Sequence, residues 1–202
     1  MSSDSDDIVL PEPASSGSVS VEEAIAKRRS VRKYSGEPLS LSELSQMLWA
    51  AQGVTSQWGG RAAPSAGGTY PLEAYAVVGD VEGASPGVYR YVPGEKTLRL
   101  AVDGDVRSEL AEAALGQSMI SEAPAIIVIS AVYERTTGRY GDRGVMYVHM
   151  EAGHAGQNIY LQAESLGLGT VAVGAFRPRQ VSQILGLPED EEPIYMYPIG
   201  RR

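Results

Sequence analysis

Apolar and polar residues alternate along this 202-residue chain with two different periods. In several segments the apolar residues lie three and four positions apart, which places their side chains on one face of a helix. Two of these segments open with the spacing of a capping box, Ser20 with Glu23 and Ser40 with Glu43. The pattern predicts helices over residues 20–29, 40–52, 105–119, 142–166 and 178–185.

Runs of β-branched and aromatic residues between these segments predict strands. The stretch APAIIVISAV at 123–132 is almost unbroken in apolar side chains, which favours a strand buried on both faces in the middle of a sheet. Pro93 and Gly94 separate GVYRYVP from TLRLAV, as in a hairpin. Further strands are predicted over 72–78, 169–175 and 193–200. This mix indicates an α+β domain with a mixed, mostly antiparallel sheet flanked by helices.

The N-terminal residues differ in composition from the rest. Residues 1–18 are rich in Ser, Asp and Pro with little to bury, which predicts a flexible tail ahead of a single domain over 19–202. A hydrophobic fraction of 43% with 21% charged residues is typical of a folded, soluble protein. The N-terminus has no basic region followed by an apolar stretch, and no apolar run is long enough to span a bilayer. We therefore expect a cytoplasmic protein.

Charge and residue content exclude several classes of function. The net charge of −8 argues against nucleic acid and anionic membranes as partners, because both would be repelled. The chain has no cysteine, so disulfides and thiolate metal sites are excluded. His149 and His154 are five apart, without the four-residue spacing that points two ligands at one metal, and Glu151 and Glu164 show no pairing. We expect no metal site.

One short stretch is basic against this acidic background. Basic residues crowd into seven positions: Lys27, Arg28, Arg29, Arg32 and Lys33. Cations at the end of a helix complement its dipole by ~0.3–1 kcal/mol each, which explains one or two of them. Arginine forks also bind phosphate in a bidentate manner, and Ser30 adds a neutral donor. A phosphate site and a solvated surface both remain open for this stretch.

Other features suit a flat, anionic ligand, although each has an ordinary structural reading. Arg201 in the terminal PIGRR could close a phosphate site, whereas Arg202 is more typical of a frayed end. The glycines of PSAGGTYP at 64–71 would let the backbone approach a planar ring, or simply form a turn. Gly174 and Ala175 leave backbone N–H groups free at the end of a strand, where they could donate to a ring nitrogen.

Together the segments RRSVRKY, PSAGGTYP, ALGQSM, LGLGTVAVGAF and the basic C-terminus resemble the flavin-dependent nitroreductase family over about residues 20–202. The PSAGGTYP motif with the hairpin after it resembles the branch of the thiazole/oxazole (azoline) dehydrogenases most. The resemblance implies a homodimer with two FMN sites at its interface, a small-molecule substrate, and NADH or NADPH as reductant. Gly174–Ala175 stands where many relatives carry Glu–Gly, and Gly68 where many carry Asn, so the nicotinamide preference is not implied.

The resemblance also implies a role for each matching residue. The FMN phosphate would be held by Arg28, Arg29, Ser30, Arg32 and Arg201. Gln117 would read the N3 and O2 edge of the isoalloxazine ring, and Gly174 and Ala175 would place N–H groups near N5. A wall against the flavin bound mainly by the other subunit would come from Pro64, Ser65, Ala66 and Gly68. The small residues of the long helix would form the dimer seam: Ala152, Gly153, Ala155 and Gly156.

The sequence leaves three functions open. The first is an FMN oxidoreductase that transfers hydride through flavin N5 to nitro compounds, quinones or other small acceptors. The second is an azoline dehydrogenase acting on modified peptides, for which Tyr140 or Tyr147 could remove a proton. A packing or surface role is the more ordinary interpretation of both tyrosines. The third is a flavin-binding or flavin-fragmenting protein without NAD(P)H turnover.

Overall fold

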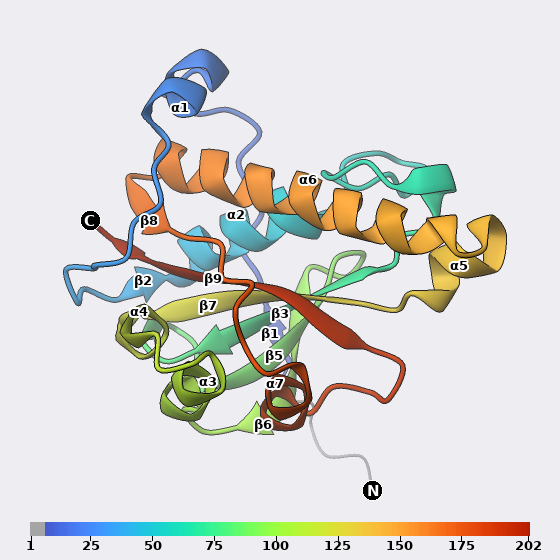
Figure 1. The fold of residues 1–202 in the computed structure, drawn as a ribbon. Helices are drawn as coiled ribbons and strands as arrows, with labels where there is room; N and C mark the ends of the chain where they lie inside the picture. Colours follow the sequence, from blue (N-terminus) through green and yellow to red (C-terminus); the bar gives the residue numbers. More distant parts are fainter. Residues whose placement is uncertain (1–6) are drawn as a thin grey trace, which may run out of the picture.

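The computed structural model describes residues 7–202, and a seven-stranded sheet lies at its centre (Figure 1). The strand order is β1–β6–β5–β3–β7–β9–β8, and every neighbouring pair is antiparallel. The strands are β1 (Ile8–Val9), β3 (Leu72–Val78), β5 (Gly87–Val92), β6 (Thr97–Asp103), β7 (Ala125–Ala131), β8 (Leu168–Thr170) and β9 (Glu192–Arg201). A parallel pair joins β2 (Leu39–Ser40) to β4 (Val81–Glu82). The α+β prediction with a mixed, mostly antiparallel sheet is confirmed.

Helices cover both faces of the sheet (Figure 1). One face carries α2 (Leu41–Gln52) and the long α6 (Arg143–Ser165), with α1 (Val21–Lys27) on the outer side of α6. The other face carries α3 (Arg107–Ala113), α4 (Ser118–Glu122) and α7 (Pro178–Leu185). Helix α5 (Glu134–Tyr140) leads directly into α6. None of the helices within residues 7–202 has both the length and the apolar character needed to cross a membrane.

Strand β7 separates the two hydrophobic cores. All of its residues are buried, and it pairs with β3 on one side and β9 on the other. Ile127 and Ile129 point into the core beneath α2 and α6, whereas Ile126 and Val128 point into the core beneath α3 and α7. This alternation explains why the sequence of β7 is apolar except at Ser130, as the almost unbroken apolar run predicted.

Local signals predicted several elements correctly. The Ser40 side chain accepts from the Glu43 N–H at 3.2 Å, and the Glu43 carboxylate accepts from the Ser40 N–H at 2.8 Å, so α2 begins with a complete capping box. Ser20 likewise accepts from the Glu23 N–H at 3.1 Å at the start of α1. Both of these helices were predicted from the capping spacing.

Two predicted elements are shorter than expected. The helix predicted over 105–119 is broken, because Leu115 and Gly116 adopt positive φ angles of 62° and 76° between α3 and α4. The strand predicted over 169–175 ends at Thr170. Beyond that point Pro198 on β9 has no N–H to donate, and the Ala172 N–H donates to the Tyr160 hydroxyl at 2.8 Å instead of to the sheet.

The prediction of a flexible tail is wrong for residues 7–18. Strand β1 pairs with β6, and Leu10 is buried in the core beneath α2 and α6. Side chains of α2 bind the segment that follows: the Ser45 hydroxyl donates to the Pro11 carbonyl at 2.7 Å, and Gln46 bonds both backbone groups of Ala14. These distant polar partners replace the hydrophobic burial that the composition lacks. The prediction for residues 1–6 lies outside the described residues.

The small residues of α6 mostly serve packing inside the chain. Ala152, Ala155 and Gly156 are buried and face the sheet, and only Gly153 of the predicted dimer seam is exposed. A Cβ atom on Gly156 would lie 2.0 Å from the hydroxyl oxygen of Tyr197, which is itself 1% exposed. Small size at these positions therefore lets α6 approach the sheet closely, and the predicted seam is corrected accordingly.

Replacing Gly156 with Ala should destabilise the fold by about 1–3 kcal/mol, because the buried Tyr197 ring has no free space into which it can move. Gly138→Ala on α5 is the matched control, since nothing lies within 4 Å of its Cβ position, and it should be neutral or stabilising by up to about 1 kcal/mol. Urea denaturation monitored by circular dichroism measures both. Equal effects of the two substitutions would contradict this account of α6 packing.

Candidate functional site

The segment that follows α1 lies along the ends of β8 and β9. The Val31 N–H donates to the Thr170 carbonyl at 2.9 Å, and the Ser35 N–H donates to the Arg201 carbonyl at 3.0 Å. This approach requires glycine at position 169, because a Cβ there would lie 2.6 Å from the Val31 side chain. The sheet therefore fixes the backbone of the basic stretch.

The hydroxyl of Tyr160 on α6 joins this stretch to the chain beyond β8. It lies 3.1 Å from the Ser30 hydroxyl and accepts from the Ala172 N–H at 2.8 Å. The guanidinium of Arg28 lies 5.1 Å from the centre of the Tyr160 ring, in a cation–π contact. Sequence reasoning missed Tyr160, whose position on the long helix looks like ordinary packing.

The positive charges of the basic stretch are largely uncompensated. Lys27 pairs with Glu23 at 2.5 Å. The remaining members form no ion pair with any carboxylate in residues 7–202, and Arg29 bonds only the carbonyls of Ala26 and Arg28, at 3.1 and 2.6 Å. Four cations, Arg28, Arg29, Arg32 and Lys33, thus lie together without an acidic partner on a protein of net charge −8.

The C-terminal arginines are engaged elsewhere. The Arg201 guanidinium bonds Glu43 at 3.0 Å and approaches Glu37 at 3.6 Å, so it faces the N-terminus of α2. Two carboxylates therefore already satisfy the residue that was predicted to close a phosphate site. Arg202 is not frayed as expected, because it bonds Glu164 and the Leu168 carbonyl.

Gln117 lies against the segment after β8. Its side-chain NH₂ donates to the Ala114 carbonyl at 2.8 Å and to the Ala175 carbonyl at 2.9 Å. Because both partners are carbonyls, both of its N–H groups are used, and the side-chain oxygen remains as an acceptor. The N–H groups of Gly174 and Ala175 have no partner in the described chain, and both residues are exposed. The expected donor half of Gln117 is thus not available.

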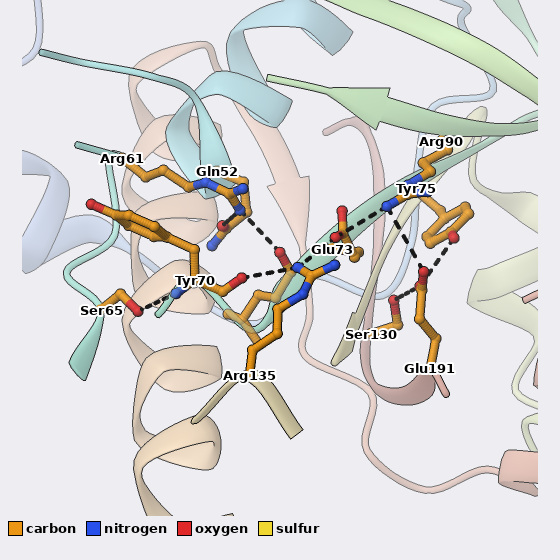
Figure 2. Close-up of polar contacts among 11 residues, drawn as sticks. Gln52, Arg61, Ser65, Tyr70, Glu73, Tyr75, Arg90, Ser130, Arg135 and Glu191 are labelled. Carbon is orange, nitrogen blue, oxygen red and sulfur yellow. Dashed lines mark hydrogen bonds and ion pairs between the residues drawn. The ribbon is translucent and has the colours of Figure 1, made fainter. Parts of the chain in front are cut away.

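The PSAGGTYP loop lies at a different place, against α5 and α6. Arg139 donates to the Gly67 carbonyl at 3.0 Å, and the hydroxyls of Thr69 and Thr136 lie 2.8 Å apart. The loop is closed on itself by the Tyr70 N–H, which donates to the Ser65 hydroxyl at 2.9 Å (Figure 2). No hydrogen bond or ion pair within residues 7–202 joins Pro64, Ser65, Ala66 or Gly68 to the basic stretch or to Gln117.

A charge network of two buried glutamates and two partly exposed arginines anchors this loop to the sheet (Figure 2). Arg135 donates to the Tyr70 carbonyl at 3.0 Å and pairs with Glu73 at 2.7 Å. Glu73 also pairs with Arg90 at 3.1 Å. Glu191, 4.0 Å from Arg90, accepts from the hydroxyls of Tyr75 and Ser130. The sequence of residues 134–144 shows no regular pattern of apolar positions. Helix α5 within this segment nevertheless supplies Arg135 and Arg139, which hold the loop.

Beneath the loop lies Glu151 of α6, which is only 2% exposed. Burial raises the pKa of its carboxyl, and this is opposed by the Ser65 hydroxyl, the Arg61 guanidinium and the Ala66 N–H. One carboxyl oxygen, Oε1, has no hydrogen-bond partner. The Arg61 guanidinium donates to Gln52 at 2.8 Å and to the Leu72 carbonyl at 3.0 Å (Figure 2). Glu151 is a further residue that the sequence did not reveal.

The two tyrosines considered for proton transfer lie together beside the loop. The rings of Tyr140 and Tyr147 are 5.2 Å apart in an edge contact, with Arg139 over the first ring and Arg143 over the second. The Tyr140 hydroxyl is the one at the loop, 2.4 Å from where a Cβ of Gly67 would lie. The described residues contain no cluster of His, Cys, Asp and Glu that could hold a metal ion.

The comparisons with known proteins agree with this architecture. The family model described as the nitroreductase family matches residues 25–201. The protein MJ1384 of Methanocaldococcus jannaschii, named as a candidate nitroreductase, is 51% identical over 184 residues, which are 91% of this chain and 92% of that protein. A candidate nitroreductase of Ralstonia eutropha JMP134 is 35% identical with a TM-score of 0.84, over 96% of this chain and 89% of that one. The chain belongs to the nitroreductase family.

Two more distant proteins have defined activities in their names. An FMN reductase [NAD(P)H] of Bacillus subtilis is 24% identical over 191 residues, which are 88% of this chain and 61% of that protein. The Escherichia coli microcin synthetase McbBCD bound to truncated pro-MccB17 contains a chain that is 22% identical with a TM-score of 0.74, over 96% of this chain and 78% of that one. At this identity the second likeness shows the fold alone.

The raised pKa of Glu151 predicts a pH-dependent penalty on stability. The folded protein retains a proton at pH values where the unfolded chain has released it, so the free energy of unfolding should fall as pH rises from the ordinary carboxyl range through the folded pKa. Glu151→Gln removes this decline, whose slope is at most about 1.4 kcal/mol per pH unit. Urea denaturation between pH 4 and 9 should show the variant gaining on the wild type as pH rises. Parallel curves would contradict the burial argument.

Proposed function

We propose that this protein is an FMN-dependent oxidoreductase that transfers hydride through flavin N5, with NADH or NADPH as reductant and a small organic molecule as acceptor. One observation carries the proposal: a row of contacts runs from Arg28 and Ser30 through Tyr160 to Ala172, and three residues further along the chain Ala175 meets Gln117. The row has cations at one end and backbone N–H donors with an amide acceptor at the other. This order suits a ligand with a phosphate at one end and a nitrogen heterocycle at the other.

The cationic end fits a phosphate dianion. Arg28, Ser30 and Arg32, with Arg29 beside them, would bind the FMN phosphate, because no carboxylate competes for their charges within residues 7–202. The backbone of this stretch is already fixed on β8, so little order is lost on binding. Arg201 is left out of the proposed phosphate shell, because Glu43 and Glu37 hold its guanidinium.

The other end fits the ring of the flavin. Gln117 would accept from the ring N3–H through its free side-chain oxygen, and the N–H groups of Gly174 and Ala175 would donate near N5. Bound FMN would supply the hydride chemistry. The residues of this chain would hold the ring in a fixed orientation, with the Gly174 and Ala175 N–H groups directed at N5 of the oxidised ring. The FMN reductase [NAD(P)H] of Bacillus subtilis supports both the cofactor and the reductant.

We also propose a homodimer in which Pro64, Ser65, Ala66 and Gly68 face the flavin held mainly by the other subunit. Within residues 7–202 of one chain, no hydrogen bond or ion pair joins this loop to the row described above. Exposed apolar side chains on the outer faces of α1 and α6 give the surface that a second copy would cover: Val21, Ile25, Val145, Met146 and Met150. These residues replace the small-residue seam expected from the sequence.

A second candidate function is azoline oxidation on a modified peptide. Such a reaction removes a hydride and a proton from the ring, and a protein base must take the proton. The observation in its favour is the Tyr140 hydroxyl, which lies at the Gly67 backbone next to the Arg139 guanidinium. The likeness to a chain of the McbBCD microcin synthetase complex supports the same branch at the level of fold.

Removal of the cationic end should weaken FMN binding specifically. Arg28→Ala and Arg32→Ala should each raise the FMN dissociation constant by a factor of about 10–150, which corresponds to about 1.5–3 kcal/mol for a charge-assisted contact. Arg179→Ala on α7 is the control, because Arg179 is another exposed arginine outside the row, and it should change nothing. The measurement is quenching of FMN fluorescence on titration with apoprotein.

The purified protein should also show the absorbance of bound oxidised flavin, and NADH or NADPH should bleach it. A colourless preparation that takes up no added FMN would remove the proposed function. Bleaching by an azoline peptide but by neither nicotinamide would favour the second candidate over the first.

The variant Tyr140→Phe removes one hydroxyl and distinguishes the two candidate functions, because only azoline oxidation would need that hydroxyl. If azoline oxidation is the reaction, losing this base should slow it by about 10²–10⁴-fold while quinone reduction by NADPH changes little. Tyr147→Phe removes the neighbouring hydroxyl from the same ring pair and serves as the control. Equal activity of wild type and Tyr140→Phe on an azoline peptide would exclude Tyr140 as the base.

A further inference from the structure

Glu151 differs from the other buried carboxyls of the fold. Glu73 has two arginine partners, and Glu191 accepts from two hydroxyls. Glu151 is as deeply buried, forms no ion pair in the described part of the chain, and has an oxygen without any partner. A buried carboxylate that is only partly satisfied is energetically costly, so its presence calls for an explanation beyond packing.

The groups around Glu151 come from the PSAGGTYP loop and from Arg61 just before it. The Ser65 hydroxyl and the Ala66 N–H face its carboxyl, and Arg61 is the charged group nearby. Arg61 is itself committed to Gln52 and to the Leu72 carbonyl, and its guanidinium lies 4.9 Å from the centre of the Tyr70 ring. Gln52 is 1% exposed, and its side-chain nitrogen also has no partner. The side-chain nitrogen of Gln52 is thus a donor without a partner, and Oε1 of Glu151 is an acceptor without a partner, within residues 7–202.

Ser65 connects the carboxyl to the shape of the loop. Its oxygen accepts from the Tyr70 N–H at 2.9 Å, so its single hydrogen is free to be donated to Glu151. An ionised Glu151 accepts from Ser65 and Ala66, whereas a neutral Glu151 has a proton of its own to donate. The other charged groups at the loop lie elsewhere: Arg139 is on the Gly67 carbonyl, and Arg135 is on Tyr70 and Glu73.

We propose that Glu151 takes up a proton from solvent when the flavin facing the Pro64–Gly68 loop is reduced, so that it balances the added charge. This inference rests on the proposed function. Two electrons and one proton added to the flavin leave one extra negative charge, and protonation of the carboxylate cancels it. Among the buried carboxyls of the described chain, Glu151 is the one that forms no ion pair and has an oxygen without a hydrogen-bond partner. It faces Ser65 and Ala66, which are assigned to the flavin wall. Because water screens charges poorly in a buried region, the charge of the reduced flavin and that of the Glu151 carboxylate would interact over several ångströms.

The test is the midpoint potential of the bound flavin as a function of pH, measured by spectroelectrochemistry. At pH values where Glu151 is ionised in the oxidised wild type, reduction of the wild type should take up one proton more per two electrons than reduction of Glu151→Gln. The midpoint potential of the wild type should therefore fall more steeply with pH. Glu191→Gln, a buried glutamate on the opposite side of the sheet that accepts from Tyr75 and Ser130, should keep the wild-type slope. Equal slopes in wild type and Glu151→Gln would overturn the proposal, as would loss of the extra proton in Glu191→Gln.

A second measurement uses the wild-type protein alone and therefore does not depend on whether a variant folds. The infrared difference spectrum between reduced and oxidised wild-type holoprotein should gain the C=O band of a buried neutral carboxylic acid, and no such band would overturn the proposal. Failure of the proposed function is recognised separately, because a protein that binds no FMN gives neither a potential nor a flavin difference spectrum and overturns both. A flavoprotein with normal NADPH turnover and no extra proton overturns this inference alone.

Discussion

The contact between Tyr160 and Ser30 joins residues that lie 130 positions apart in the chain. It ties the basic stretch to the long helix, while Val31 ties it to β8 and Arg28 stacks on the Tyr160 ring. The backbone of the basic stretch is thereby held in place, and Arg28, Arg29, Arg32 and Lys33 form no ion pair with a carboxylate within residues 7–202. Because like charges repel, this arrangement favours the binding of an anion. The assignment of the rest of the site depends on that constraint.

Helix α6 carries both parts of the candidate site. Tyr160 lies near its C-terminal end and contacts the basic stretch, whereas Glu151 lies nine residues earlier, about 14 Å along the axis, beneath the PSAGGTYP loop. In the described part of one chain, no hydrogen bond joins the two parts directly. A second copy whose loop covers the flavin end of the row would complete the site, and the exposed apolar side chains of α1 and α6 suit that arrangement.

Elements with a local physical signal were predictable from the sequence. The N-caps at Ser20 and Ser40 and the almost unbroken apolar run of β7 depend on neighbours in sequence or on burial alone. Partners distant in sequence decided the rest: Pro198 and Tyr160 shorten β8, and Ser45 and Gln46 hold the N-terminal segment.

The same division applies to the candidate site. The residue types of the basic stretch and of Gln117 indicated their chemistry, and the structure places Gln117 beside Ala175. The sequence could not reveal that both donors of Gln117 are used, or that Glu43 and Glu37 hold Arg201. Nor could it reveal Glu151, because a single glutamate on a helix gives no sign of being buried.

A crystal structure of the protein grown with FMN tests the central claim most directly. The account predicts the phosphate on Arg28, Ser30 and Arg32, the ring edge at the Gln117 side-chain oxygen, and the Pro64–Gly68 loop of a second copy against the ring. Electron density showing the phosphate away from the basic stretch, or the basic stretch bound to carboxylates of a neighbouring subunit with no flavin beside it, would contradict it.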